Sequence, residues 1–292
     1  MKKFVIYSAI IGNYDEILQP TIVDDRFDYI LFSNDFIDRR IGIWQIRNIK
    51  YHNDIQTKIA RWVKTHPEEL LPEYECSLWI DANIDIKDIS VYERIINLYN
   101  EGKMISSMVH LWRNCIYDEM IAVVKHKFET EECIIKWGHQ LRKNKYPLKN
   151  GLFETGVLFR NHKKSLMISF DKLWWQCIEK YSRRDQLSFN FVLWKLNIEC
   201  EYFLSNRENT RNSNLFSINV NHAHTTYQKS EYSWNDTKLF RFIYYYPYKQ
   251  LFNIYYWIYS LPLPLLGARI TGLYLGVKNK LKRFHSLNTK SI

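Results

Sequence analysis

The chain has 292 residues, enough for one large hydrophobic core, and its 46% apolar and 25% charged residues are typical of a folded globular protein. The five cysteines form no CxxC pair, which argues against a disulfide framework and against a zinc site. The net charge is +10, but nine of the 41 basic residues and none of the 31 acidic residues follow Thr237. Residues 1–236 are therefore nearly neutral, which does not favour nucleic acid as a partner.

Short apolar runs alternate with helical patterns along the chain, and this alternation predicts an α/β layered sheet. The N-terminal apolar run is too short for a signal peptide, so we interpret it as the first strand. The predicted strands are 3–10, 27–32, 43–49, 76–81, 104–109 and 153–159. The predicted helices are 54–64, 90–100, 115–142, 163–180 and 184–196.

The most informative stretch is an apolar run, Cys76 to Ile80, that leads directly into Asp81 and Asn83. A carboxylate at the end of a buried strand costs free energy unless it is paired or binds a cation. In α/β folds, ligands lie in the crevice at the carboxyl ends of the strands. We therefore predict that Asp81 and Asn83 are oxygen ligands of a divalent ion that carries a diphosphate. The alternative interpretation is a strand followed by a solvated turn.

The order of several short motifs resembles that of family 8 glycosyltransferases, which have the GT-A fold. Two longer motifs, Trp-Ile-Asp-Ala-Asn-Ile and His-x-x-Arg-x-Cys-Ile-Tyr-x-Glu, are closer to the glycosyltransferase-like domain of plant mucilage-related and bacterial surface-polysaccharide proteins. The resemblance covers about residues 3–225 and implies a GT-A-like, Rossmann-related mixed central sheet flanked by helices. The motifs that carry the resemblance to family 8 are Ala60-Arg61, Leu70-Leu71-Pro72, Asp81-Ala82-Asn83, Thr155-Gly156-Val157 and Asp185-Gln186.

The resemblance implies a donor-binding site for a UDP-sugar. The turn after the first strand would form the uridine pocket, with Tyr14 as the stacking ring and Ala9 and Asn13 beside it. Lys58 and Arg61 are one helical turn apart and share a face, where they would contact the diphosphate. The alternatives are an ordinary polar turn and a solvated helix face.

Two carboxylates are expected near the donor sugar. Glu154 stands where the family has Asn, and it would act as a base or bind hydroxyl groups. Asp185 and Gln186 open a helix at the position that the family uses for the sugar hydroxyls and for catalysis, although Asp185 is equally consistent with a first-turn cap. His110 and Arg113 follow the strand 104–109 and are expected to contact the donor.

The expected cofactor is Mn²⁺ or Mg²⁺. The family often supplies a third metal ligand from a late histidine, a role that His222 or His224 would take. Asn83 replaces the second acid of the family's Asp-x-Asp motif, and its amide oxygen carries no charge. We therefore expect weaker metal binding than an Asp would give.

Residues 237–292 form a basic tail with 13 aromatic residues before Lys290. The tail lacks an unbroken apolar run long enough to span a bilayer. Its Tyr, Trp, Lys and Arg content favours an in-plane anchor on an anionic membrane surface. Alternatives are a helical cap on the body or a dimer surface. We therefore predict a GT-A domain over 1–236 and a membrane-associating tail over 237–292.

The sequence as a whole predicts a cytoplasmic glycosyltransferase that is peripheral on the inner face of the cell membrane. It would transfer a hexose from a UDP-sugar to a glycan or lipid-linked acceptor in surface polysaccharide biosynthesis, as for a capsule or lipopolysaccharide. The alternative is a non-catalytic, membrane-associated scaffold with the same fold, which the Asn83 departure favours. A sugar nucleotidyltransferase is disfavoured because no Gly-rich phosphate loop follows the first strand.

Overall fold

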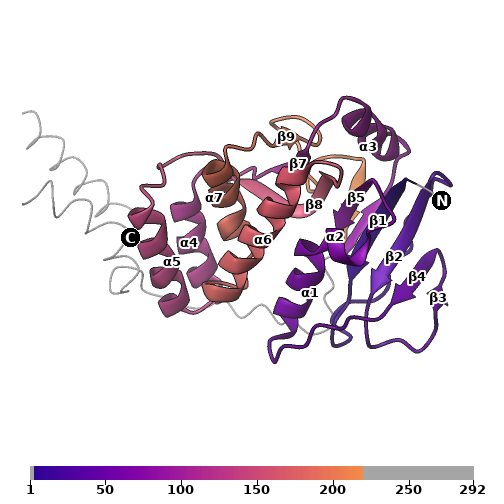
Figure 1. Ribbon diagram of the computed structural model, residues 1–292, viewed down its shortest axis with the longest axis horizontal. Helices are drawn as coiled ribbons and strands as arrows, with labels where there is room; N and C mark the ends of the chain where they lie inside the picture. Colours follow the sequence, from indigo (N-terminus) through magenta and orange to yellow (C-terminus); the bar gives the residue numbers. More distant parts are fainter. Residues whose placement is uncertain (1–2, 220–292) are drawn as a thin grey trace, which may run out of the picture. The chain divides into compact units, whose positions relative to one another are not determined.

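The predicted first strand, β1 (Phe4–Ala9), lies inside a large mixed sheet (Figure 1). The structure is a computed structural model that describes residues 3–219. The other strands are β2 (Phe27–Phe32), β3 (Arg40–Ile41), β4 (Trp44–Arg47), β5 (Cys76–Ile80), β6 (Ile84–Ile86), β7 (Ile105–Val109), β8 (Phe153–Asn161), β9 (Glu201–Tyr202) and β10 (Phe216–Ile218). The helices are α1 (Gln56–Thr65), α2 (Pro67–Leu70), α3 (Ser90–Asn100), α4 (Ile116–Lys125), α5 (Glu131–Lys143), α6 (Ser165–Lys180) and α7 (Gln186–Leu196).

Within the described residues, eight strands pair in the order β3-β4-β2-β1-β5-β8-β7-β9, and β6 pairs with β10 in a second, small sheet. Strands β4, β2, β1 and β5 are parallel, whereas β8 runs antiparallel to both β5 and β7. The prediction of a mixed central sheet flanked by helices is confirmed. Because β1, β2, β4 and β5 are parallel, their carboxyl ends meet at one edge, where α/β folds bind ligands.

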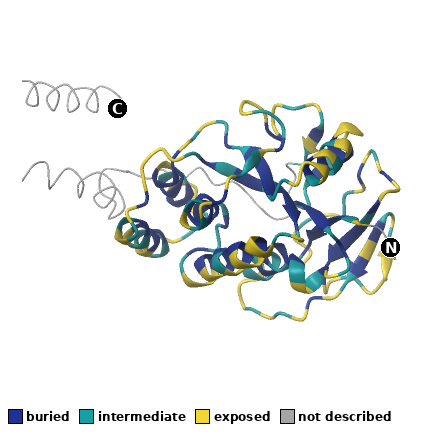
Figure 2. Cartoon of the chain, turned by 45° about the horizontal axis from the view of Figure 1, so that its top comes forward, coloured by how far each residue is buried: buried dark blue, intermediate teal, exposed yellow. Residues whose placement is uncertain are grey.

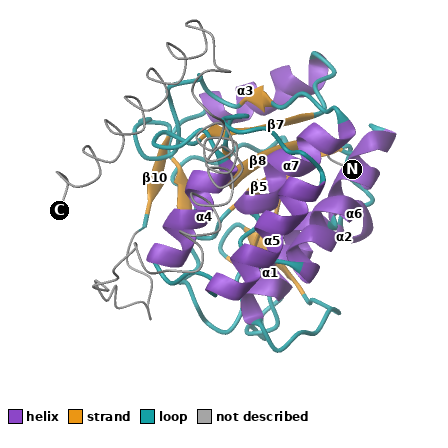
Figure 3. Ribbon diagram, turned by 90° about the vertical axis from the view of Figure 1, so that its left-hand side faces the viewer, coloured by secondary structure: helices purple, strands orange, loops and turns teal. Residues whose placement is uncertain are grey.

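The sheet buries both faces, as Figure 2 shows for its strands. Ile6 of β1 joins a core cluster with Tyr92 and Ile95 of α3. The next residue, Tyr7, points to the other face because side chains alternate along a strand. That face is covered by α1, α6 and α7, which pack against one another in that order (Figure 3).

The last turn of α1 is fixed to the sheet through its main chain. The carbonyl oxygen of Lys64 accepts hydrogen bonds from the Tyr7 hydroxyl at 3.0 Å and from Nη2 of Arg160 at 2.6 Å. Carbonyl groups in the last turn of a helix have no partner within the helix, so these side chains satisfy one of them. Arg160 is fully buried and its Nη1 lies 2.6 Å from Asp171. The network therefore sets the position of the Lys64 side chain.

A bulge in β8 redirects the side chains of its first half. The pairing with β7 shifts register between Ser107 and Met108, so that Ser107 faces Leu158 and Met108 faces Glu154. The Ser107 hydroxyl donates to the main-chain oxygens of Glu154 and Val157 and closes the irregular segment. Bulges of this kind reorient side chains and are frequent beside active sites.

The predicted single helix over 115–142 is wrong. The segment forms two helices, α4 and α5, because the chain turns at Lys127, whose φ is 56°. The Thr130 side chain then caps α5 by accepting a hydrogen bond from the Cys133 main-chain nitrogen.

No helix among residues 3–219 is long and apolar enough to cross a membrane. The predicted tail at 237–292 lies outside the described residues.

Candidate active site

Two carboxylates and two cations form a cluster at the carboxyl edge of the sheet. Nε of Arg61 lies 3.0 Å from Oδ1 of Asp185, and Nζ of Lys64 lies 2.6 Å from Oδ2 of the same carboxylate. Oδ1 of Asp81 lies 3.5 Å from Nζ of Lys64 and 4.0 Å from Nη1 of Arg61. The Thr155 hydroxyl donates to Oδ2 of Asp185 at 2.8 Å. Helix α1, β5, β8 and the start of α7 therefore contribute to one site.

The cluster is buried except at Asp81. The side chain of Lys64 is fully buried and that of Asp185 is 5% exposed, whereas that of Asp81 is 35% exposed. A ligand therefore reaches the cluster from the Asp81 side. The Lys64 ammonium group also lies over the rings of Trp79, at 5.2 Å, and Trp174, at 5.9 Å, and such cation–π contacts stabilise the charge.

The charged groups of the cluster and their burial shift one another's pKa values. Burial raises the pKa of Asp185, but Arg61 and Lys64 outweigh it and keep the pKa well below its usual range. Burial lowers the pKa of Arg61, and Asp185, Asp81 and Tyr14 reverse that shift. Burial also lowers the pKa of Lys64, which the two carboxylates only partly oppose. Asp185 is therefore an anion at neutral pH and is not a proton donor.

Asp81 and Asn83 are the residues expected to bind a metal ion. Oδ1 of Asp81 accepts a hydrogen bond from the Trp79 indole at 2.8 Å, so Oδ2 is the oxygen left for a ligand. Nδ2 of Asn83 donates to the Asn219 carbonyl oxygen, so its amide oxygen is available. Residues 3–219 contain no cluster of three or more His, Cys, Asp and Glu side chains arranged to hold a metal. This donor set fits an ion that takes its remaining ligands from phosphate oxygens, as Mg²⁺ commonly does. His222 and His224 lie outside the described residues.

Gly156 allows the Asp81 carboxylate to approach β8 closely. A Cβ atom at this position would lie 3.1 Å from Cδ1 of Ile84 and 3.4 Å from Oδ2 of Asp81. The main-chain nitrogen of Asp81 donates to the Gly156 carbonyl oxygen at 2.8 Å. The absence of a side chain at Gly156 therefore leaves room at the oxygen that faces a ligand.

The turn after β1 carries the residues expected to bind the nucleotide. Ala9 is the last residue of the strand, and Gly12 and Asn13 adopt positive φ angles of 69° and 51°. A Cβ atom on Gly12 would overlap the Gln56 side chain at the start of α1. Tyr14 is 42% exposed and interacts electrostatically with Arg61. The turn therefore brings Tyr14 near Arg61.

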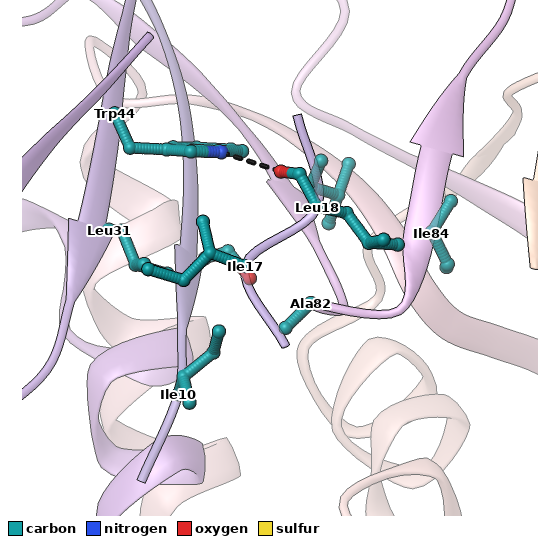
Figure 4. Close-up of a pocket in the computed structure, with 9 residues that line it drawn as sticks. Ile10, Ile17, Leu18, Leu31, Trp44, Ala82 and Ile84 are labelled. Atoms are coloured by element: carbon teal, nitrogen blue, oxygen red, sulfur yellow. Dashed lines mark hydrogen bonds between the residues drawn. The ribbon is translucent and has the colours of Figure 1, made fainter. Parts of the chain in front are cut away.

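A small, mostly apolar pocket lies near the carboxyl ends of β1, β2 and β5 and beside Trp44, the first residue of β4 (Figure 4). Ile17 and Leu18, from the connection between β1 and β2, line the pocket together with Trp44 and Ser8. The Trp44 indole donates to the Leu18 carbonyl oxygen at 2.8 Å. The Ser8 hydroxyl is buried, and no described residue hydrogen-bonds to it. The other residues that line the pocket are apolar, so Ser8 supplies its one polar side chain among the described residues.

A second polar cluster surrounds the end of β7. The Arg113 guanidinium pairs with the buried Glu119 carboxylate at 2.5 Å, and Nδ1 of His110 accepts a hydrogen bond from the Arg113 main-chain nitrogen at 3.0 Å. Nη1 of Arg211 lies 2.6 Å from Oε2 of Glu154. Burial raises the pKa of Glu154 and Arg211 partly opposes the shift. A raised pKa makes a carboxylate a stronger base.

His110 gives the fold a pH dependence that can be measured. Burial, with Arg113 and Arg211 beside it, lowers the pKa of His110 to about 4 from the ordinary 6.5. Between these values the unfolded chain binds more protons, so the free energy of unfolding falls as the pH drops from 6.5 to 4. We expect His110→Gln to flatten this dependence, by at most about 1.4 kcal/mol per pH unit.

Urea unfolding of the parent and of His110→Gln at pH 4.5, 5.5, 6.5 and 7.5 tests this prediction. His162 also has a lowered pKa, to about 3, so the comparison depends on the difference between the two profiles. The exposed His52→Gln variant is the control and should follow the parent. Identical slopes for His110→Gln and the parent would show that His110 does not titrate in this way.

The two clusters do not include Lys58. The predicted residues that they contain are Arg61, Asp81, Asp185, His110, Arg113 and Glu154. The Lys58 ammonium group donates to the Glu179 carbonyl oxygen at 2.8 Å, on α6. Lys64, which the sequence analysis did not select, occupies the site instead. The sequence could have indicated Lys64, because it is three residues after Arg61 and so lies on the same helix face.

Gln186 is the first residue of α7, beside Asp185. The sequence analysis also did not select Thr155, Arg184 and Arg211 as site residues.

Comparison with known proteins relates the chain to glycosyltransferase-like domains. A family model described as TOD1/MUCI70, glycosyltransferase-like domain, matches residues 1–222. No curated protein matches the chain.

Several solved glycosyltransferase structures are similar to the chain at low sequence identity. The apo structure of the bifunctional glycosyltransferase WbbM is 11% identical, with a TM-score of 0.41, and the match covers 69% of this chain. This chain spans only 38% of the WbbM chain. The galactosyltransferase LgtC, in complex with donor and acceptor sugar analogues, is 12% identical, with a TM-score of 0.41 and coverage of 68% of this chain and 72% of LgtC. Mouse xyloside xylosyltransferase 1 is 9% identical, with a TM-score of 0.42 and coverage of 69% and 84%.

Proposed function

Because the chain belongs to the TOD1/MUCI70 family of glycosyltransferase-like domains, as its motifs indicated, we propose that it transfers a hexose from a UDP-sugar to a glycan or lipid-linked acceptor. The observation that carries this proposal is the buried cluster of Arg61, Lys64, Asp81 and Asp185 at the carboxyl edge of the sheet. Glycosyl transfer from a nucleotide donor leaves a diphosphate, whose charge grows as the bond to the sugar breaks. Fixed cations near that charge stabilise the transition state.

Each residue of the cluster has a distinct proposed role. Arg61, whose guanidinium matches the planar geometry of phosphate oxygens, contacts the diphosphate together with Lys64. Asp185 holds both cations in place and, as an anion, accepts hydrogen bonds from the sugar hydroxyls. Gln186 stands beside it at the start of α7 and contacts the same sugar.

Glu154 is the proposed general base at the acceptor side. It lies in the second cluster with Arg211, and Trp112 beside them is 64% exposed. An exposed Trp ring offers an apolar face on which a sugar ring can pack. We therefore place the acceptor over Trp112 and Glu154, with the donor over Arg61 and Asp185.

A divalent ion, Mn²⁺ or Mg²⁺, is proposed to bind at Asp81 and Asn83 together with the diphosphate, with His222 or His224 as a further ligand. When bound, such an ion adds positive charge next to the leaving group. In the protein itself, Asp81 offers one free carboxylate oxygen and Asn83 an uncharged one. We therefore expect the ion to bind weakly in the absence of nucleotide.

Calorimetry with UDP, in the presence and absence of Mn²⁺, tests the donor site and its metal. Asn83→Asp should tighten Mn²⁺ binding about tenfold because a charged oxygen replaces a neutral one. Asp81→Ala should remove the effect of Mn²⁺ on UDP affinity. Equal Mn²⁺ affinity in Asn83→Asp and the parent would exclude Asn83 as a ligand, and UDP affinity unchanged in Asp81→Ala would move the donor site elsewhere.

We propose further that the protein acts in surface polysaccharide biosynthesis on the cytoplasmic face of the cell membrane. The support is the sequence of residues 237–292, which has nine basic residues and no acidic residue. Basic and aromatic side chains together favour anionic lipid surfaces. A lipid-linked acceptor would then be held at the same surface. The alternative function, a non-catalytic scaffold with this fold, would bind UDP without cleaving a donor.

A further inference from the structure

Arg184, the residue before Asp185, is a cation that no carboxylate in the described part of the chain pairs with. It is half-buried, and its Nε is buried without a hydrogen-bond partner among residues 3–219. Its guanidinium carbon lies 4.8 Å from the centre of the Phe128 ring, so the side chain is held in place by an aromatic face. A buried N–H group without a partner costs free energy, so its presence in a folded protein needs an explanation, and a bound anion provides one.

The surroundings of Arg184 contain more cations than anions. Arg61 and Lys64 are paired with Asp185 and Asp81, and Arg113 is paired with Glu119. Arg184 adds one positive charge to this otherwise balanced group. Its pKa is lowered first by burial and then by repulsion from Arg61, whereas Asp185, Glu119 and Asp81 oppose the shift. Without a ligand, these side chains therefore carry one more positive charge than negative charges.

The position of Arg184 indicates which anion it receives. Tyr14 of the predicted nucleotide turn interacts with Arg61. Arg184 precedes Asp185 in the chain and interacts with Arg61, Asp185 and Asp81 of the first cluster and with Glu119 of the second. Arg184 therefore lies between the two clusters, whereas Arg61 also interacts with the turn that carries Tyr14. We propose that Arg184 binds the terminal phosphate of the nucleoside diphosphate. This inference rests on the proposed function, and it adds a residue that needs no metal to act.

Arg183 provides a matched control for this proposal. It is adjacent in sequence, but its guanidinium donates to the Phe128 carbonyl oxygen and lies near Glu129. Arg184→Gln should weaken UDP binding about 10- to 100-fold in EDTA, since a charge-assisted hydrogen bond to phosphate is lost. Arg184→Lys should restore part of the affinity, and Arg183→Gln should bind like the parent. Without ligand, Arg184→Gln should unfold at the same temperature as the parent or higher, because an unpaired buried charge is removed.

Calorimetry of the full chain with UDP, UMP and inorganic pyrophosphate separates the outcomes. The proposal expects Arg184→Gln to lose affinity for UDP and pyrophosphate while keeping the parent's affinity for UMP. Equal loss for UMP would assign Arg184 to the other phosphate and overturn the proposal. A parent that binds UDP, with Arg184→Gln equal to it, would overturn this inference and leave the proposed function standing. Arg184-dependent binding of pyrophosphate, in a parent that does not bind UDP, would support the anion site and contradict the nucleotide donor.

Discussion

Asp185→Asn is expected to abolish sugar transfer and to destabilise the protein. The substitution removes the anion that neutralises both Arg61 and Lys64, the second of which is fully buried. Breaking a buried ion pair by removing one partner costs about 3–5 kcal/mol, because the remaining charge stays buried. The rate of transfer should fall by at least about 10²-fold, since the cations lose the geometry that receives the diphosphate. Urea unfolding and the initial rate of donor cleavage measure the two effects.

The pH dependence gives the same prediction a second readout. The pKa of Asp185 is depressed in the folded protein, so its contribution to stability is present above the unfolded pKa of about 4 and is lost as the pH falls below it. Asp185→Asn should lack this loss. Asp38→Asn, which changes an exposed carboxylate, should stay within about 0.5 kcal/mol of the parent. A stable, fully active Asp185→Asn would contradict the assignment of this residue to the reaction centre.

Lys64→Met is expected to reduce transfer by about 10²–10³-fold with a smaller loss of stability than Asp185→Asn. Met fills a similar volume without a charge. Asp185 keeps its ion pair with Arg61 and its hydrogen bond from Thr155, so no buried charge is left alone. Measuring kcat/KM and the free energy of unfolding for Lys64→Met and Asp185→Asn tests whether Lys64→Met loses activity with the smaller loss of stability.

Lys58→Met is the matched control because it lies on the same helix and its ammonium group donates to the Glu179 carbonyl oxygen outside the cluster. It should keep parental activity. An equal loss of activity in Lys58→Met and Lys64→Met would mean that the helix as a whole, and not the ammonium group at Lys64, matters for transfer.

The fold and part of the site, namely Arg61, Asp81 and Asp185, could be predicted from the sequence because they follow from patterns within short segments. The apolar run that ends at Asp81 marks the strand β5, and the alternation of strands and helices indicates the layered sheet. Arg61 and Asp185 followed from the order of motifs. The chain's membership in a glycosyltransferase-like family confirms that this order was informative.

The remaining parts depend on contacts between segments that are far apart in sequence. Lys64 reaches Asp185 because Tyr7 and Arg160 hold its main chain, and no local pattern reports that arrangement. Arg211 meets Glu154 across 57 positions, after a bulge that the strand pattern does not reveal. The same holds for Asp85, whose partner Thr21 is 64 positions away in sequence. Its carboxylate accepts hydrogen bonds from the main chain and hydroxyl of Thr21, both at 2.7 Å.

The most direct test of the central claim is the release of nucleoside diphosphate from a panel of UDP-, GDP- and ADP-sugars by the full chain, with Asp185→Asn and Asp38→Asn measured in parallel. A glycosyltransferase with its reaction centre at Arg61, Lys64, Asp81 and Asp185 should release UDP from a UDP-hexose in the parent and in Asp38→Asn, but not in Asp185→Asn. Binding of UDP without release from any donor, with or without Mn²⁺, would contradict the claim and favour a non-catalytic scaffold.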